Sequence, residues 1–150
     1  MLIGALEAGG TKMVCAIGDE EGNILDRISI PTDTPDISMP KVAVYFRSKD
    51  IKALGIGCFG PIDLNKDSKT YGYITSTPKP NWANVDFVGL ISKDFKIPFY
   101  FTTDVNSSAY GETIARSNVK SLVYYTIGTG IGAGAIQNGE FIGGMGHTEA

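Results

Sequence analysis

Apolar runs the length of β-strands alternate with polar or glycine-rich turns along most of the chain. This pattern predicts strands at residues 2–6, 13–17, 24–30, 51–57, 98–102 and 122–127, and a hairpin around residues 71–75. Between them, helices are predicted at residues 37–48, 85–95 and 106–116. Strands that alternate with helices indicate an α/β domain, and the first three strands are expected to form an antiparallel meander.

The beginning and the end of the chain resemble each other. Both read as apolar strand, Gly/Thr turn, apolar strand, polar turn with glycine, and apolar strand, and Gly9-Gly10-Thr11 is matched in kind by Gly128-Thr129-Gly130. Such internal similarity indicates two related lobes. We therefore expect a first lobe at residues 1–117 and the opening strands of a second, incomplete lobe at residues 118–150, with an exposed strand edge that favours association.

Composition narrows the class of protein. The chain has 150 residues, of which 43% are hydrophobic and 19% are charged, which excludes a disordered chain. The net charge is −3 and the 13 Lys and Arg residues are scattered, so no nucleic-acid partner is expected. No apolar run is long enough for a membrane span, and residues 1–7 lack the basic region of a secretory signal, so a cytoplasmic location is expected.

The residues that commonly bind metals or form disulfides are few. Cys15 and Cys58 lie in apolar strand-like runs and are expected to be buried free thiols in a reducing compartment. One histidine and no C-x-x-C pair leave no complete zinc site within the chain.

Glycine is over-represented, with 19 residues, and it is clustered. Residues 55–60 (GIGCFG) match the G-x-G-x-x-G pattern directly after a predicted strand. A dinucleotide site requires a helix to begin there, but the turn-rich residues 61–67 follow instead. We therefore expect Gly60 and Pro61 to form a tight turn that brings backbone close to a ligand.

Residues 9–12 (GGTK), here called the first glycine turn, have two interpretations. They form either an ordinary Gly-Gly hairpin or an anion-binding nest of backbone N–H groups, to which Thr11 adds a hydroxyl and Lys12 a positive charge. A second glycine turn at residues 126–132 (TIGTGIG) shifts the interpretation towards the anion-binding nest, because two opposed nests can hold different phosphates of one nucleotide.

Asp104 follows a predicted strand and stands at the start of a predicted helix. In α/β sheets ligands bind beyond the carboxyl ends of strands, and a carboxylate there can take the proton of a hydroxyl that attacks phosphorus. The alternative is that Asp104 caps the helix through the N–H groups of Asn106 or Ser107. Asn106 has the same two interpretations.

Three further residues are candidates for sugar contacts. His147 and Glu149 follow a glycine run and either reach sugar hydroxyls or are simply solvated. Trp82, the only tryptophan, either stacks on a sugar or anchors its proline-rich loop, and we favour the anchor.

Taken in order, these motifs resemble the ROK family of sugar kinases and repressors, which share the actin-like ATPase (ribonuclease H-like) fold. Residues 7–12 (EAGGTK) and 126–132 resemble the two phosphate loops of the family, residues 57–61 (GCFGP) its sugar-side turn, and residues 103–112 (TDVNSSAYGE) the segment of the catalytic aspartate. Residues 73–82 (YITSTPKPNW) resemble the bacterial fructokinase branch. The resemblance covers essentially the whole chain.

The resemblance implies ATP-dependent phosphorylation of fructose at its 6-hydroxyl, with Asp104 as the general base. It implies sugar contacts from Gly60, Thr103, Asn106, His147 and Glu149. It implies contacts with ATP phosphates from Gly9, Gly10, Thr11, Lys12, Thr126, Gly128, Thr129 and Gly130. It also implies Mg²⁺ with the nucleotide, a homodimer, and Zn²⁺ only in full-length relatives, which are about twice as long.

Two other functions fit the same sequence. The chain is either an inactive N-terminal fragment of such a kinase or a sugar-binding regulator of the family. A regulator needs a helix-turn-helix ahead of the first strand, which the strand predicted from Leu2 does not leave room for.

Overall fold

The computed structural model describes residues 1–116, 118–128 and 131–143. The first sheet and its helices comprise β1 (Ile3–Ala8), β2 (Lys12–Gly18), β3 (Ile24–Pro31), α1 (Pro35–Arg47), β4 (Ala53–Cys58), α2 (Phe87–Ser92) and β7 (Phe99–Thr103). A small hairpin comprises β5 (Tyr73–Ile74) and β6 (Val85–Asp86). The rest comprises α3 (Asp104–Ala115), β8 (Leu122–Ile127), β9 (Ile131–Gln137) and β10 (Glu140–Phe141). The expected α/β architecture is confirmed.

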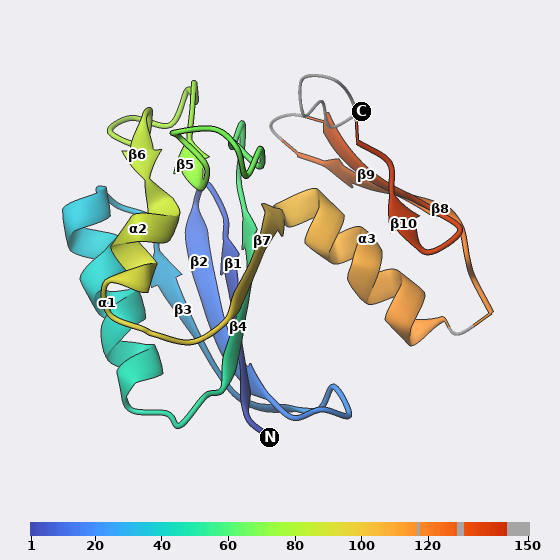
Figure 1. Ribbon diagram of the computed structural model, residues 1–150, viewed down its shortest axis with the longest axis horizontal. Helices are drawn as coiled ribbons and strands as arrows, with labels where there is room; N and C mark the ends of the chain where they lie inside the picture. The colour runs from blue at the N-terminus through green and yellow to red at the C-terminus, as the bar shows by residue number, and fades with distance from the viewer. Residues whose placement is uncertain (117, 129–130, 144–150) are drawn as a thin grey trace.

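The main sheet has five strands in the order β3-β2-β1-β4-β7 (Figure 1). Strands β1, β2 and β3 form the predicted antiparallel meander, whereas β4 and β7 run parallel to β1. Ala8 pairs with Cys58, and Cys58 pairs with Thr103, so these three parallel strands end level with one another. We call this end of the sheet the carboxyl edge.

The core lies on one face of this sheet, under α1 and α2 (Figure 1). In β1 the residues Gly4, Leu6 and Ala8 are buried, whereas Ala5 and Glu7 between them are exposed, as expected for a strand with one packed face. Large fully buried side chains fill the space between the layers, among them Phe46, Phe87 and Trp82. Burial of each such side chain stabilises the fold by roughly 1.5–3 kcal/mol.

Trp82 anchors its loop, as predicted. Its ring is fully buried between Phe59 and Phe87, and its indole Nε1–H donates a hydrogen bond of 2.7 Å to the carbonyl oxygen of Asp33. The loop of residues 77–82 is thereby tied to the segment that follows β3.

The second sheet has the order β10-β9-β8 and is antiparallel throughout. Its order repeats that of β3-β2-β1, which agrees with the likeness between the two ends of the sequence. Helix α3 contacts β4 of the first sheet and both β8 and β9 of the second, so it connects the two sheets (Figure 1). The division into lobes at residue 117 stays a prediction.

The predicted helix at residues 85–95 is shorter than expected. Val85 and Asp86 form β6, which pairs with β5, and the helix begins at Phe87. The Asp86 side chain accepts the N–H of Gly89 at 2.8 Å and is the N-cap of α2. Among the described helices, none is long and apolar enough to cross a membrane.

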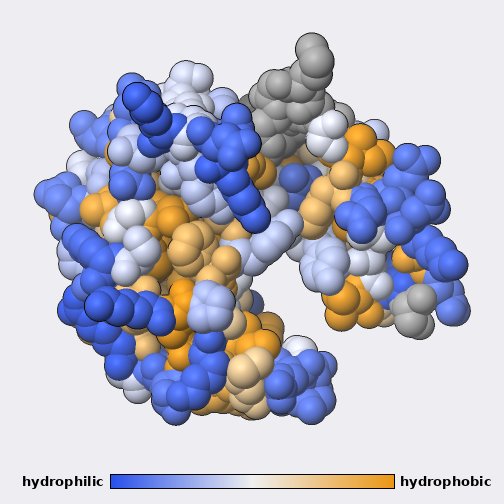
Figure 2. Space-filling model, viewed as in Figure 1, coloured by the Kyte–Doolittle hydropathy of each residue, from blue (hydrophilic) through white to orange (hydrophobic). Residues whose placement is uncertain are grey.

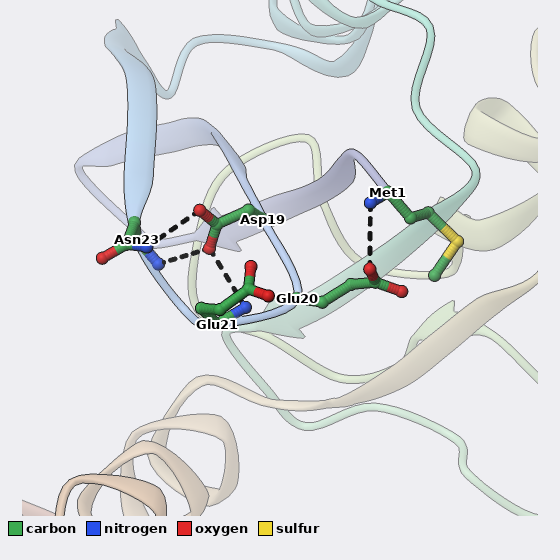
Figure 3. A network of polar contacts seen from close by, with 5 residues as sticks. All are labelled: Met1, Asp19, Glu20, Glu21 and Asn23. Atoms are coloured by element: carbon green, nitrogen blue, oxygen red, sulfur yellow. Dashed lines mark hydrogen bonds and ion pairs between the residues drawn. The ribbon is translucent and has the colours of Figure 1, made fainter.

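The turn between β2 and β3 lies at the opposite end of the sheet from the carboxyl edge (Figure 1), and Figure 3 shows its polar contacts. One carboxylate oxygen of Asp19 accepts the backbone N–H groups of Glu21 and Asn23, and the other accepts the Asn23 side-chain amide. These bonds, led by that of the Asn23 amide, hold the pKa of Asp19 below its usual value. The chain's amino terminus pairs with Glu20 beside this turn.

Cys15 and Cys58 are fully buried free thiols, as predicted, and burial raises the pKa of Cys15 to about 12. We predict that neither thiol reacts quickly with an aromatic disulfide reagent at pH 8, because a buried thiol ionises poorly and is out of reach. The release of the coloured thiolate measures this directly. Both thiols should react rapidly in denaturant, and rapid labelling of the folded chain would contradict the placement of the cysteines.

Candidate functional site

The carboxyl edge brings together three of the segments that the sequence singled out. The first glycine turn follows β1 directly, and Asp104 follows β7 directly. Gly60 is the second residue after β4. Since β1, β4 and β7 are neighbours with level ends, the backbones of Gly9 and Asp104 are two strand spacings apart, about 10 Å. Ligands of open α/β sheets bind at this edge.

The first glycine turn has the properties of an anion nest. The Gly9 N–H donates to the Lys12 carbonyl oxygen at 3.0 Å, and a Cβ on Gly9 would lie 2.7 Å from that oxygen, so only glycine fits. A Cβ on Gly10 would meet nothing within 4 Å. In the described part of the chain, the N–H groups of Gly10 and Thr11 donate to no protein acceptor, and Lys12 is exposed. These groups fit a phosphate, which needs N–H donors and positive charge.

The chain bends at Gly60 and Pro61, and no helix follows in the described residues before α2. The Phe59 N–H donates to the Ala8 carbonyl oxygen at 2.8 Å, which ties this turn to β1. Thr75 donates to the Pro61 carbonyl oxygen through both its N–H (2.8 Å) and its hydroxyl (3.1 Å). The Gly60–Pro61 peptide bond is cis. Gly60 itself remains partly exposed at the carboxyl edge.

Helix α3 begins at Asp104, two residues earlier than predicted, and its N-cap is Thr103. The fully buried Thr103 hydroxyl accepts the Asn106 N–H at 3.2 Å. Asp104 does not accept the N–H of Asn106 or Ser107 as a cap would; its Oδ1 accepts the Val105 N–H at 2.9 Å. The capping interpretation therefore applies to Thr103 rather than to Asp104.

The second glycine turn is described only in part. Thr126 and Gly128 belong to the described residues, whereas Thr129, Gly130, His147 and Glu149 lie outside them. Thr126 lies one residue before the end of β8 and pairs with Gly132 of β9.

Strand β9 packs directly on the first turn of α3, and glycine makes this possible. A Cβ on Gly134 would lie 2.5 Å from the Val105 carbonyl oxygen, and one on Gly132 would lie 3.3 Å from Val105 Cγ1. Val105 follows Asp104 at the start of α3, and Gly132 pairs with Thr126 near the end of β8. The contact therefore brings the end of β8 beside the start of α3. The sequence pattern did not indicate this packing role of Gly132 and Gly134.

A cavity of about 610 Å³ lies against the open face of the first sheet, on the side away from α1 and α2. Ala5 and Gly55 line it from the sheet, Tyr110 from α3, and Glu140 and Phe141 from β10. Figure 2 shows the notch between the two parts of the molecule. Glu7, Gly57 and Ser107, which lie beside the carboxyl edge, also line the cavity, whereas Asp104 and the first glycine turn are not among its described lining residues.

Metal ligands do not cluster in the described ranges. No group of three or more His, Cys, Asp or Glu side chains there is placed to hold a metal ion.

Comparison with known proteins identifies the family. A model of the ROK family matches residues 3–150, so the chain belongs to the ROK family. It is 74% identical to a fructokinase of Streptococcus mutans over 151 residues, which cover 99% of this chain and 52% of that protein. The chain thus spans about half the length of the curated relatives it matches.

Solved structures support the fold. A ROK family protein from Streptococcus pneumoniae in complex with sucrose matches all of this chain and 50% of its own, with a TM-score of 0.85 and 22% identity. A ROK glucokinase from Streptomyces griseus in complex with glucose and AMPPNP matches 99% of this chain and 49% of its own, with a TM-score of 0.79 and 24% identity. The actin-like ATPase fold expected from the resemblance is confirmed.

Replacement of Gly134 by alanine tests the packing of β9 on α3. We predict that Gly134→Ala destabilises the chain by about 1–3 kcal/mol, because the new Cβ meets rigid backbone. Gly111→Ala is the matched control: it lies in α3, its Cβ would meet nothing within 4 Å, and helix propensity predicts a gain of about 0.5–1 kcal/mol. Denaturant unfolding measures both, and equal stability of the two variants would contradict the close contact.

Proposed function

We propose that this chain is the N-terminal part of a kinase that transfers the γ-phosphoryl group of ATP to the 6-hydroxyl of fructose. The observation that carries the proposal is the alignment of Asp104 with the first glycine turn at one edge of three parallel strands. A proton acceptor and a phosphate-binding turn at that separation fit the two ends of a phosphoryl transfer.

In this mechanism the Asp104 carboxylate accepts the proton of the sugar 6-hydroxyl as the hydroxyl oxygen bonds to the γ-phosphorus, and the bond from that phosphorus to the bridging oxygen breaks to release ADP. The N–H groups of Gly10 and Thr11 donate to phosphate oxygens, and the Lys12 ammonium offsets their charge. Thr126, Gly128, Thr129 and Gly130 are proposed to hold other phosphates of the same nucleotide from the opposite side.

A Mg²⁺ ion bound mainly by the phosphates would neutralise part of their charge. Because the described residues form no cluster of metal ligands, this ion is proposed to arrive with ATP, and Zn²⁺ is proposed only for full-length relatives.

Sugar binding is proposed for Gly60, Asn106, His147 and Glu149. Gly60, after β4, and Asn106, in the first turn of α3, are partly exposed, as a sugar contact requires. Thr103 is fully buried and its hydroxyl accepts the Asn106 N–H, so its proposed part in sugar binding is to hold Asn106 in place. The preference for fructose over glucose or mannose rests on the similarity to the Streptococcus mutans fructokinase.

Residues 118–150 are proposed to begin the second, nucleotide-binding lobe. In the first sheet β1 has neighbours on both sides, β2 and β4, whereas in the described part of the second sheet β8 pairs only with β9. Val123, Tyr125 and Ile127 of β8 are strongly exposed. We propose that polypeptide corresponding to the second half of the longer relatives covers this strand. A homodimer and a cytoplasmic location also remain proposals.

The exposed strand also favours a second candidate, an inactive half of a kinase. Burial of Val123, Tyr125 and Ile127 requires a partner, and without one the nucleotide site is expected to be incomplete. Activity of this chain alone, and of a chain extended to the length of its relatives, distinguishes the two candidates.

Asp104→Asn tests the proposed base. We predict that it lowers the rate of fructose 6-phosphate formation from ATP, Mg²⁺ and fructose by about 10²–10⁴-fold, because the amide cannot accept the proton. A coupled assay measures the product. Asp36→Asn, in the first turn of α1, is the matched control and should retain activity. Unchanged turnover in Asp104→Asn would refute the base; turnover only in the extended chain would identify this chain as half an enzyme.

Gly10→Ala tests the phosphate nest. Its Cβ would meet no protein atom within 4 Å, so we predict a stability within about 0.5 kcal/mol of the unsubstituted chain. The methyl group would occupy the space in front of the N–H donors, and we expect the affinity for Mg–ATP to fall at least about tenfold, or 1.4 kcal/mol. Calorimetric titration measures the affinity, and equal affinity of both chains would argue for an ordinary hairpin.

A further inference from the structure

Thr32 contacts both ends of the first glycine turn, although the sequence did not single it out. It follows β3 directly and is buried. Its hydroxyl donates a hydrogen bond of 2.7 Å to the Gly9 carbonyl oxygen, and its N–H donates one of 2.9 Å to the Thr11 carbonyl oxygen. One residue thus fixes two carbonyl groups of this turn.

The bond to the Gly9 carbonyl determines the direction of the Gly10 N–H donor. In a trans peptide the C=O and the following N–H point in opposite directions, because the six atoms of the unit are coplanar. With the Gly9 carbonyl held on Thr32, the Gly10 N–H points away from Thr32. It is one of the two N–H groups of the turn, with that of Thr11, that lack a protein acceptor in the described residues.

Thr32 is itself held by the loop of residues 77–82. The Lys79 ammonium donates to the Thr32 carbonyl oxygen at 3.0 Å, and the buried Trp82 indole donates to that of Asp33 at 2.7 Å. The Asp33 N–H donates in turn to the fully buried Ser38 hydroxyl at 2.8 Å. The chain is therefore fixed on both sides of the Thr32 peptide unit by groups far away in sequence.

We propose that Thr32 is a positioning residue that orients the first glycine turn for the phosphate groups of a nucleotide, and that Lys79 and Trp82 hold Thr32 in place. This inference rests on the proposed phosphate-binding function of that turn. Thr32 touches no ligand in this mechanism. It limits the conformations of the turn, so it affects the affinity for nucleotide and leaves proton transfer at Asp104 unchanged.

The test compares four variants of the 150-residue chain, the fourth being Lys79→Met. Thr32→Val removes the hydroxyl and keeps the shape and the N–H, Thr32→Ser restores the hydroxyl, and Thr113→Val removes a hydroxyl that donates to a carbonyl within α3. Amide hydrogen exchange of Gly9, read by NMR, reports the opening of the turn. Titration with Mg–ATP reports the affinity of the chain for this nucleotide.

We expect Thr32→Val to speed Gly9 exchange and to weaken Mg–ATP binding, each by about 3- to 10-fold, the effect of one lost hydrogen bond. Thr32→Ser and Thr113→Val should match the unsubstituted chain in both measurements. Lys79→Met should speed Gly9 exchange by a smaller factor, and an unchanged rate would refute the support from the loop.

Failure of the inference and failure of the proposed function give different results. If the unsubstituted chain binds Mg–ATP and Thr32→Val binds it equally well, the positioning role is refuted. If Thr32→Ser behaves like Thr32→Val, the hydroxyl is not responsible and the role is again refuted. If neither the unsubstituted chain nor a chain extended to the length of its relatives binds Mg–ATP, the phosphate-binding function of the turn fails, and the nucleotide role of Thr32 fails with it.

Discussion

Ala8, Cys58 and Thr103 are neighbours across three parallel strands, and the whole candidate site depends on that register. A slip of one residue would turn every side chain of a strand to the opposite face and displace the turn that follows by about 3.3 Å. The buried side chains on the packed face prevent this slip, because each of them would then be exposed. The hydrophobic core under α1 and α2 thus determines where polar groups stand at the carboxyl edge.

The strands of the first sheet were predictable because each combines an apolar run with a clear turn signal on either side. The start of α2 was not, since Val85 fits a helical spacing and its pairing with β5 involves residues far along the chain. The start of α3 was also placed too late. Thr103 directly before Asp104 is a common N-cap signal, and giving weight to it would have identified the cap correctly.

The candidate site was predictable only as far as its motifs are local. Gly9, Gly10 and Gly134 are all glycines in similar sequence surroundings, yet their structural roles differ. A side chain on Gly9 would collide with a carbonyl oxygen of its own turn, one on Gly10 would meet open space, and one on Gly134 would collide with α3. Only tertiary contacts distinguish these roles. Thr32 shows the same limit, because nothing near it in the sequence indicates that its hydroxyl reaches Gly9.

The position of the single tryptophan gives the chain an internal optical probe. Trp82 is shielded from water, and its indole N–H is bonded to Asp33, the residue next to Thr32. An indole in such surroundings emits at shorter wavelength than one in water, and its emission changes when its hydrogen bond or its packing changes. Fluorescence excited in the tryptophan band therefore reports on the surroundings of Trp82 without any added label. Trp82 is connected to the first glycine turn through Asp33 and Thr32.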